Sequence, residues 1–375
     1  MNMADHASGL LTIDLDAVAA NWRLLRDRVA PAACAAVVKA DAYGLGLAPV
    51  ARRLAAEGCR EFFVAQIGEA VSLAGILSGR ADDAAIYVLD GFAPDAVDAD
   101  DGAAARAIPV LNSREAAADW SRHAARQGRR VAAMIQIDTG MARLGLTPAE
   151  AAALAGEGAL DGLDLRGVMS HLACAGEAGH AMNAEQLAAF RAARGPFPGI
   201  RGSLANSSGI FLGPDYHFDL ARPGSALMGL TPLTDQTNPM RQVINLQAKI
   251  LQVQHIDTGR SVGYGASHRV GRPSRIATVA VGYADGYLRS LGNRGSAFIG
   301  ANRVPVVGRV SMDLITLDVT EAPESLTRPG DMVDLIGPHN PPDALAAEAG
   351  TIGYEILTAL GHRYKRRYLG EGGDA

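Results

Sequence analysis

The first two thirds of the chain alternate short apolar segments with helix-like stretches, and this alternation limits the fold more than any other feature. The segments are rich in Val, Ile, Leu and Ala, and amphipathic stretches such as 113–128 separate them. In that stretch Ser113 is a suitable N-cap and Glu115 falls in the first turn. Alternation of this kind predicts parallel strands joined by crossover helices. The expected strands lie at 32–40, 61–66, 84–91, 107–113, 131–140, 163–171, 200–208 and 218–224.

Eight strand–helix units favour a (β/α)₈ barrel, which typically takes ~250 residues. A doubly wound open sheet is the competing architecture. We prefer the barrel because eight units suffice to close one, and because no Gly-rich dinucleotide-binding sequence follows the first strand. The predicted fold class is therefore α/β, with a TIM-type barrel over residues 12–233.

A polar, turn-rich stretch at 235–239 (DQTNP) marks the end of the predicted barrel. Beyond it, Gly and Pro separate alternating segments and few helical patterns occur, which predicts a mostly-β domain. A short helix is expected at 351–361. We assign residues 234–375, together with residues 1–11, to this second domain. Its expected strands lie at 247–256, 275–283, 296–300, 303–312, 314–320 and 331–337.

Composition excludes several classes of function. Hydrophobic residues make up 48% of the chain, and the net charge of −5 opposes nucleic-acid binding, which calls for a basic surface. The three cysteines give no disulfide framework and no CxxC metal motif. Because no typical signal peptide and no run of ~18 apolar residues occur, we expect a cytoplasmic protein without a membrane partner. The missing metal motif predicts that no metal is bound.

The chain has only three lysines, Lys39, Lys249 and Lys365, so few amines could serve as a nucleophile. Lys39 ends the first expected strand, where barrel active sites form. A surface lysine is the ordinary interpretation of such a position, but the apolar run before Lys39 predicts burial, and burial lowers a lysine's proton affinity. The other two lie where solvated charge is common, in an alternating strand and an Arg-rich tail. Lys39 is therefore the candidate Schiff-base lysine.

Polar residues end the later strands as well and together form a ring on one rim of the predicted barrel. Each alone has a structural explanation, as a hydrogen-bonded histidine or a solvated arginine. Phosphate sites in such barrels lie after strands seven and eight, where glycine and backbone N–H groups suit an anion. A lysine and a phosphate site on one mouth indicate pyridoxal 5′-phosphate, or an aldolase acting on a sugar phosphate. The ring comprises Arg143, His171, Asn206, Ser207, Arg222, Gly224 and Ser225.

Nine motifs carry a resemblance to a known family. VVKADAYGLG, around Lys39, is similar to the cofactor-lysine signature of the alanine racemases, which are fold-type III pyridoxal-phosphate enzymes. The other motifs follow in the family's order and span both predicted domains. They are DTGMARLG, SHLACAGE, NSSG, ARPG, VGYGAS, VGYADGY, VGRVSMD and TIGYE.

The resemblance implies a homodimer that interconverts L-alanine and D-alanine, supplying D-alanine for peptidoglycan or catabolising alanine. Each active site would combine the barrel of one subunit with the β domain of its partner. Lys39 and Tyr264 would be the two catalytic bases, on opposite faces of the substrate, and Lys39 would also bind the pyridoxal 5′-phosphate.

The resemblance also implies a set of cofactor-binding residues. Arg222 would face the ring nitrogen and Arg143 the phenolic oxygen of the cofactor. Because arginine cannot accept a proton, Arg222 would leave that nitrogen unprotonated and disfavour transamination. The phosphate and the rest of the cofactor would contact Tyr43, His171, Asn206, Ser207, Gly224, Ser225 and Tyr354.

On the substrate side, the family implies that Arg143, the Met312 backbone and Asp313 hold the amino acid, and that Tyr283 and Tyr354 narrow the entrance. Tyrosines in strands more often pack a core, and an aspartate such as Asp313 is also ordinary in a turn. Tyrosine has an unperturbed pKa of ~10, too high for a base near neutrality. A nearby cation would lower that pKa, so we expect a chain of contacts from Arg222 through His171 to Tyr264.

The sequence departs from the family pattern at three places. Gln136 stands where many members carry a carbamylated lysine that steadies the arginine at position 143, and its amide can still bond Arg143. Ser311 stands where some members have cysteine, and Glu177 is the only acid in the stretch AGE. None of these positions touches the expected proton transfers.

Four other functions compete with this hypothesis. A non-catalytic cofactor-carrying barrel would lack the second domain and Tyr264. A related decarboxylase would carry an acid at the ring nitrogen, which Arg222 opposes, and a broad-specificity racemase usually carries an export signal. An aldolase has only Lys39 in its favour.

Overall fold

A computed structural model describes residues 7, 9–98 and 104–370 of the chain. They divide into two compact units: a barrel unit, Val18–Arg241, and a β unit formed by the residues up to Ala17 with those from Gln242 onward. The barrel unit begins and ends a few residues later than the predicted range 12–233. The shift at the start arises because β1 (Gly9–Asp14) pairs with two strands of the β unit, β11 (Ile244–Ile256) and β19 (Lys365–Leu369).

Within the described residues, a seven-stranded parallel sheet and the strand pair β10–β2 join through hydrogen bonds, so that eight strand positions close into a barrel. Strands β3 to β9 pair in chain order, and β10 pairs with β2. β2 and β3 occupy one position, interrupted at Ala35, whose N–H donates to the Ala221 carbonyl at 2.9 Å. The ring closes where the Arg222 N–H donates to the Ala205 carbonyl at 2.9 Å. The bounds are β2 (Ala33–Cys34), β3 (Ala36–Val37), β4 (Glu61–Val64), β5 (Ala85–Val88), β6 (Ala107–Leu111), β7 (Val131–Gln136), β8 (Leu163–Met169), β9 (Gly202–Ser203) and β10 (Leu220–Ala221).

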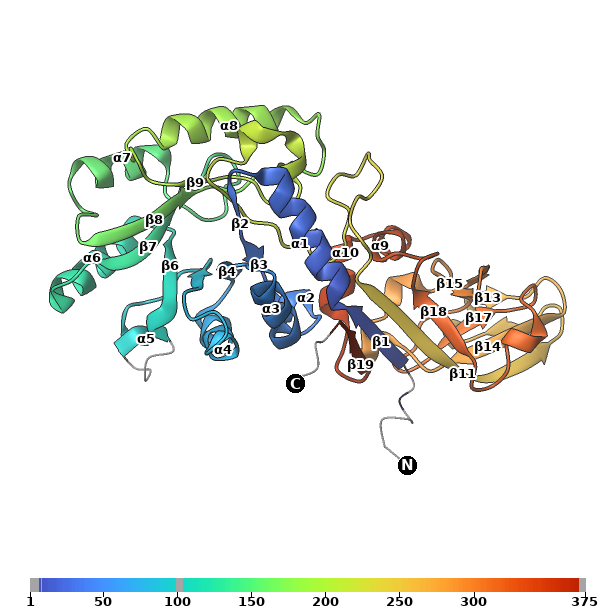
Figure 1. The fold of residues 1–375 in the computed structure, drawn as a ribbon. Coiled ribbons are helices and arrows are strands. Elements are labelled where there is room, and N and C mark those ends of the chain that lie inside the picture. Colours follow the sequence, from blue (N-terminus) through green and yellow to red (C-terminus); the bar gives the residue numbers. More distant parts are fainter. Residues whose placement is uncertain (1–6, 8, 99–103, 371–375) are drawn as a thin grey trace. The chain divides into compact units, whose positions relative to one another are not determined.

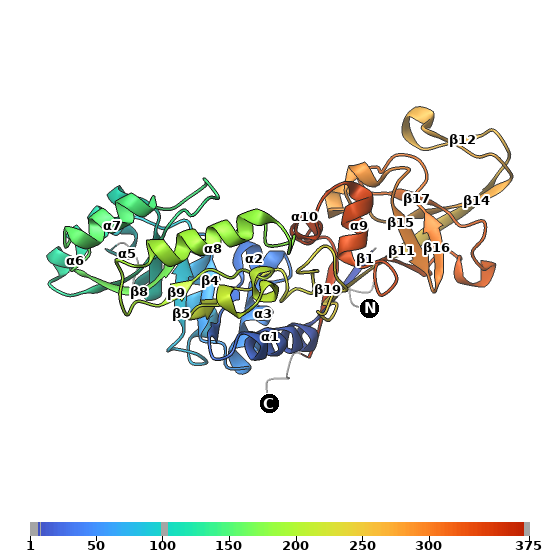
Figure 2. The same cartoon turned by 90° about the horizontal axis from the view of Figure 1, so that it is seen from above.

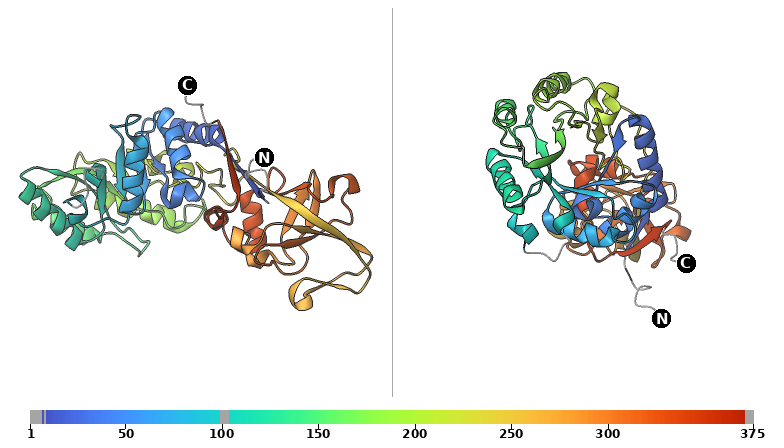
Figure 3. Two further views of the ribbon diagram at one scale, coloured as in Figure 1. Left: turned by 90° about the horizontal axis from the view of Figure 1, so that it is seen from below. Right: turned by 60° about the vertical axis from the view of Figure 1, so that its left-hand side comes forward.

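Helices follow the strands of the barrel unit and lie outside them (Figures 1 and 3). α6 (Arg114–Gln127) begins as predicted, because Ser113 Oγ accepts the Ala116 N–H at 3.2 Å. α4 (Ile67–Leu77) and α7 (Pro148–Gly156) begin with capping boxes. No helix in the described ranges is long and apolar enough to cross a membrane. The remaining helices here are α1 (Leu15–Val29), α2 (Lys39–Tyr43), α3 (Leu47–Ala56), α5 (Asp95–Asp98) and α8 (Ala181–Ala193).

Side chains fill the inside of the barrel, so it is a core and not a channel. Phe63 and Tyr87 stack there with ring centroids 4.5 Å apart. Below them, at the amino ends of the strands, the Tyr87 hydroxyl donates to Glu61 Oε2 at 3.2 Å, and Arg201 donates to both oxygens of Glu61. The rest of the interior comprises Ala35, Val37, Ile108, Val110, Met134, Met169 and Leu220.

The β unit is organised around one long strand, β11 (Ile244–Ile256), which pairs with β1, β18 and β14. Its first half alternates buried and half-buried residues, as an amphipathic strand should. β12 and β13 form a hairpin that extends away from the other strands of the unit (Figure 2). The remaining elements are β12 (Ser261–Val262), β13 (His268–Arg269), β14 (Ser274–Val279), β15 (Ser296–Ile299), β16 (Asn302–Pro305), β17 (Ile315–Asp318), β18 (Met332–Ile336), α9 (Pro342–Ala349), α10 (Gly353–Ala359) and β19 (Lys365–Leu369).

The predicted fold class, an α/β barrel followed by a mostly-β domain, is confirmed. Each of the eight expected barrel segments contains a strand, and each expected segment of the β unit contributes one or lies beside one. β19 (KRRYL) was missed because its charge is typical of a solvated tail. It forms a strand because it pairs in parallel with β1, and its residues alternate between exposed and half-buried.

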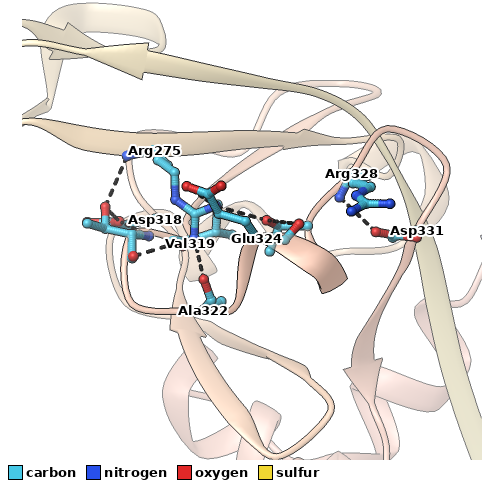
Figure 4. A network of polar contacts seen from close by, with 9 residues as sticks. Arg275, Asp318, Val319, Ala322, Glu324, Arg328 and Asp331 are labelled. Atoms are coloured by element: carbon cyan, nitrogen blue, oxygen red, sulfur yellow. Dashed lines mark hydrogen bonds and ion pairs between the residues drawn. The ribbon is translucent and has the colours of Figure 1, made fainter.

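A buried arginine organises the connection after β17 (Figure 4). Arg275, in β14, donates to the Val319 carbonyl at 2.6 Å, to the Ala322 carbonyl and to Thr327 Oγ1 at 3.1 Å. Its own N–H donates to Thr320 Oγ1 at 3.0 Å. One guanidinium therefore satisfies several acceptors that the loop would otherwise bury without partners.

We expect Arg275→Met to lower the free energy of unfolding of the β unit by about 3 kcal/mol, because buried acceptors left without a donor cost roughly 1–3 kcal/mol each. The measurement is the urea-unfolding midpoint. Arg272→Met is the matched control, since Arg272 forms an exposed pair with Glu321 that should contribute less than about 1 kcal/mol. Equal losses in the two variants would contradict the structural role of Arg275.

Candidate active site

The carboxyl ends of the barrel strands bring the predicted barrel residues together. Lys39 follows β3, Arg143 follows β7 and His171 follows β8. Arg222, directly after β10, forms an isolated parallel bridge with Asn206, which follows β9. The charges of Arg222, Arg143 and Lys39 all act on the imidazole of His171, so these four side chains share one mouth of the barrel.

Lys39 begins α2, which is a left-handed turn. Ala40, Asp41, Ala42 and Tyr43 all have φ between 53° and 58°. None of them is glycine, and this backbone costs L-residues roughly 1–2 kcal/mol each, so other contacts must offset it. Lys39 is half-buried in the structure, so the expectation that its apolar strand would bury it is met only in part.

Ser207, Gly224 and Tyr43 form a cradle suited to an anion. Ser207 Oγ accepts the N–H groups of Gly224 at 2.9 Å and Ala226 at 3.2 Å. A Cβ added at Gly224 would lie 2.1 Å from the Tyr43 hydroxyl oxygen, so only glycine permits this approach. Ser225 is buried in the same loop. Clustered hydroxyls and backbone N–H groups are the donors that bind phosphate in proteins.

Asn206 supports this cradle through the backbone. Its Oδ1 accepts the Gly209 N–H at 2.9 Å, and its Nδ2 donates to the Leu172 carbonyl at 3.5 Å. These bonds join the ends of two strands and hold the loop that carries Ser207. Through these two side-chain hydrogen bonds, Asn206 therefore holds the backbone of the loop that carries Ser207.

Arg222 lies buried among neutral partners. Its guanidinium donates to the Ser203 carbonyl at 2.8 Å, to Ser203 Oγ at 2.6 Å and to the Ser170 carbonyl at 2.6 Å. No ion pair between Arg222 and a carboxylate occurs among the described residues. Burial lowers its pKa to about 10, which still leaves it charged at neutral pH. The site thus holds a buried positive charge that only an anion or an acceptor from outside could balance.

His171 is neutral at the barrel mouth. Burial, and then the charges of Arg222, Arg143 and Lys39, lower its pKa to about 3. A neutral imidazole donates from one nitrogen and accepts at the other. The described hydrogen bonds of the Arg222 guanidinium go to Ser203 and Ser170 and not to His171, so the expected contact between Arg222 and His171 stays a prediction.

The loop that carries Arg143 is tightly ordered. Asp138 Oδ1 accepts backbone N–H groups from Gly140 at 2.9 Å and Met141 at 2.8 Å, and these bonds lower the pKa of the Asp138 carboxyl. The side-chain amide of Gln136 donates to the Leu144 carbonyl at 2.9 Å. We expected this amide on Arg143 itself; in the structure it holds the neighbouring backbone, and so supports Arg143 through the loop.

Within the β unit, contacts connect the segments that carry Tyr283, Met312 and Tyr354. The Tyr283 N–H donates to the Ser311 carbonyl at 3.0 Å, beside Met312, and Asp313 pairs with Arg363 at 2.7 Å. The α10 segment carries Tyr354, and its end contacts the turn after Tyr283, where a Cβ at Gly286 would lie 2.0 Å from the Ala359 carbonyl. Tyr264 lies in the turn between β12 and β13.

These β-unit side chains are exposed. Tyr264 is 70% exposed and Met312 54%, while Tyr283 and Tyr354 are also open to solvent. The ordinary interpretation of Tyr283 and Tyr354, that they pack in the β core, is therefore wrong. Exposed apolar side chains that form a large patch commonly mark a binding surface, and these four are candidates for one.

Sequence reasoning missed several residues that shape the site. Ser203 and Ser170 hold Arg222, and Glu69 accepts the N–H of Ala40 at 2.6 Å. The signal for Ser170 was present, because it begins the motif SHLACAGE. Ser203 and Glu69 had none, since their partners lie far along the chain.

Comparison with known proteins agrees with this geometry. The family models described as "Alanine racemase, N-terminal domain" and "Alanine racemase, C-terminal domain" match residues 13–232 and 243–368. The chain belongs to the alanine racemase family. The resemblance found in the motifs is thereby confirmed, and the match covers both units.

Individual alanine racemases show the same similarity. The alanine racemase of Rhodospirillum rubrum is 54% identical, over 99% of this chain and 98% of its own. The catabolic alanine racemase of Agrobacterium fabrum is 48% identical over 98% of this chain and 94% of its own. The crystal structure of the Bartonella henselae alanine racemase with covalently bound pyridoxal phosphate superposes with a TM-score of 0.91 at 42% identity, covering 97% of this chain and 100% of that one.

We expect the imidazole of His171 to stay neutral from pH 8 down to pH 5, and Arg143→Gln to raise its pKa, because the variant removes one of the cations that disfavour protonation. Burial is the largest cause, so the pKa should remain below the usual 6.5. The measurement is an NMR titration of the His171 ring. Arg126→Gln, an exposed change in α6, should leave the titration unchanged. A wild-type ring that titrates near its usual pKa would contradict this electrostatic description.

Proposed function

We propose that this protein interconverts L-alanine and D-alanine with pyridoxal 5′-phosphate as its cofactor, using Lys39 and Tyr264 as the two bases. The observation that carries the proposal is the arrangement at the barrel mouth. Lys39, a phosphate-type cradle and a buried arginine without an acid partner converge there, in a chain of the alanine racemase family.

The residues present fit pyridoxal phosphate. The cradle of Tyr43, Ser207 and Gly224 clusters hydroxyl and N–H groups that suit a phosphate, and the absence of a Cβ at Gly224 lets the Tyr43 hydroxyl reach this loop. Lys39, on the same mouth, supplies the amine that holds the cofactor covalently. When bound, pyridoxal phosphate accepts the charge that develops when the α proton of an amino acid leaves.

Arg222 controls how much charge the ring accepts. A guanidinium has donors and no acceptor, so it can face the ring nitrogen only as a hydrogen-bond donor. Ser203 and Ser170 hold this guanidinium in place with three hydrogen bonds. Next to the Arg222 cation the ring nitrogen would stay unprotonated, which would disfavour transamination.

Racemisation needs a base on each face of the α carbon, because the proton leaves one face and returns to the other. Lys39 serves one face. Tyr264 serves the other, and because it is 70% exposed in the single chain, we assign it to the site of a partner subunit. We propose that its hydroxyl faces the barrel mouth that holds His171 and the positive charge of Arg222.

We propose that the exposed surface of the β unit covers the barrel mouth of the second copy in a homodimer. This surface comprises Tyr264, Tyr283, Met312 and Tyr354, with the exposed Ile352 beside them. Covering the mouth excludes water from the proton transfers. Because the Asp313 carboxylate is engaged by Arg363, we assign the substrate carboxylate to Arg143 and to the backbone of Met312 and Asp313.

The same site serves either direction of metabolism, since racemisation is reversible. Relatives of both kinds are similar to this chain: the Agrobacterium fabrum protein is named catabolic, and a biosynthetic alanine racemase of Pseudomonas aeruginosa has a TM-score of 0.88 at 33% identity. We propose that the product enters peptidoglycan synthesis as D-alanine or alanine catabolism as L-alanine. A cofactor carrier without catalysis would have no use for the second domain.

We expect Tyr264→Phe to lower the interconversion of alanine by about 10²–10⁴-fold, because one of two general bases is removed. The face served by Lys39 remains active, so one enantiomer should still exchange its α proton with solvent. The measurement is incubation in deuterated water with L-alanine or D-alanine, followed by chiral chromatography and mass spectrometry.

The wild-type protein is the reference in the same assay, with L-alanine, L-serine and L-lysine as substrates. Deuterated D-alanine should predominate. No exchange with any of these amino acids would refute the proposed activity, and a Tyr264→Phe protein as active as wild type would refute the second base.

We expect Lys39→Ala and Tyr264→Phe subunits, each with little or no racemisation alone, to recover activity when mixed and allowed to exchange. In a two-fold dimer the hybrid carries one site with both bases, so an equal mixture should reach about a quarter of wild-type activity. The measurement is racemisation before and after subunit exchange. Mixing that restores nothing, with hybrid dimers present by native mass spectrometry, would contradict a shared site.

A further inference from the structure

The backbone after Lys39 adopts a conformation that needs outside support. Four consecutive non-glycine residues from Ala40 to Tyr43 have positive φ. Inside the turn, the Gly44 N–H donates to the Ala40 carbonyl at 2.7 Å, and the Gly46 N–H donates to the Asp41 carbonyl at 2.9 Å. Local bonds of this kind exist in right-handed turns as well, so they do not explain the handedness.

Glu69 contacts the start of this turn from a different element. It lies in the first turn of α4, and its Oε1 accepts the Ala40 N–H at 2.6 Å. Its Oε2 accepts the N–H groups of Ala65 at 2.8 Å and Gln66 at 3.2 Å. One carboxylate thus ties the residue after Lys39 to the start of a helix, and both of its oxygens are used.

The far end of the turn is tied down in the same way. Asp41 Oδ1 accepts the N–H of Leu47, the first residue of α3, at 2.6 Å. Between these two anchors lies Tyr43, whose hydroxyl is held so close to Gly224 that no side chain fits there. These two anchors, at Ala40 and Asp41, therefore set both the direction of Lys39 and the position of Tyr43.

We propose that Glu69 is a positioning residue: by holding the Ala40 N–H it keeps the left-handed turn in place, and the turn aims Lys39 and Tyr43 at the cofactor. This inference rests on the proposed function for the part that concerns pyridoxal phosphate. The anchoring itself is a property of the chain alone and can be measured without the cofactor.

The chain contains a matched control for Glu69. Glu150 occupies the same position in α7, third from its start, and closes a capping box with Thr147. Its Oε2 accepts the N–H and the hydroxyl of Thr147, both at 2.9 Å. Both bonds stay at its own helix start, so a change at Glu150 perturbs a helix in the same manner without touching the lysine turn.

The first experiment compares apo Glu69→Gln and apo Glu150→Gln by hydrogen–deuterium exchange. A glutamine has one acceptor oxygen and cannot replace both oxygens of Glu69. We expect exchange in peptides covering 38–47 to accelerate by about tenfold or more in Glu69→Gln, as the loss of a charge-assisted bond predicts, and to stay unchanged in Glu150→Gln. Circular dichroism confirms that both variants are folded. Unchanged exchange in Glu69→Gln would overturn the proposal.

The second experiment adds pyridoxal phosphate to the same proteins. We expect Glu69→Gln to bind it about tenfold more weakly and to shift the pH titration of its visible absorption, because the amine is no longer held in one direction. Glu150→Gln should match wild type in both measurements. Equal changes in the two variants would show a general loss of helix stability and overturn the positioning role.

Failure of this inference and failure of the proposed function can be told apart. If wild type racemises alanine and the absorption of Glu69→Gln is unchanged, the positioning role is wrong and the proposed function stands. If wild type binds no pyridoxal phosphate, the proposed function is wrong, and faster exchange in Glu69→Gln then describes a backbone anchor with no positioning role.

Discussion

The closing of the parallel barrel is the constraint on which the rest of the site depends. The N–H of Ala35 donates to the Ala221 carbonyl and that of Arg222 to the Ala205 carbonyl, so the last strand position joins both the first and the seventh. Only this closure brings Lys39, at the end of the first strand, beside residues almost 200 positions later. Parallel strands also end on the same side, which is why the polar residues share one mouth.

The mouth so formed has an unusual balance of charge. Lys39, Arg143 and Arg222 contribute cations, and His171 is kept neutral by burial and by those same cations. Arg222 is held by neutral serine groups, although a buried arginine commonly has a carboxylate partner. Such a site binds an anion with acceptor atoms well, and pyridoxal phosphate has both a phosphate and acceptor ring atoms. The electrostatics of the barrel and its family membership therefore support the same chemistry.

The sequence was a good guide where a residue's role follows from its local pattern. Alternation of apolar residues predicted the strands, and Ser113 predicted the start of α6. The sequence was a poor guide where contacts with residues distant in the chain decide the secondary structure, the exposure or the hydrogen-bond partner of a residue. β19 is strand because β1 pairs with it, Tyr283 and Tyr354 are exposed and not part of the β core, and Gln136 bonds the Leu144 carbonyl where we had expected Arg143.

The amino-acid sequence by itself determined the order of strands and helices, the fold class and the family, because periodicity and motif spacing are properties of a linear chain. Only the tertiary structure decided the handedness of the turn after Lys39, the anchor from Glu69 and the serine partners of Arg222. Those features depend on backbone torsions and on hydrogen bonds between distant segments, and such bonds form only where folding has brought donor and acceptor within about 3 Å.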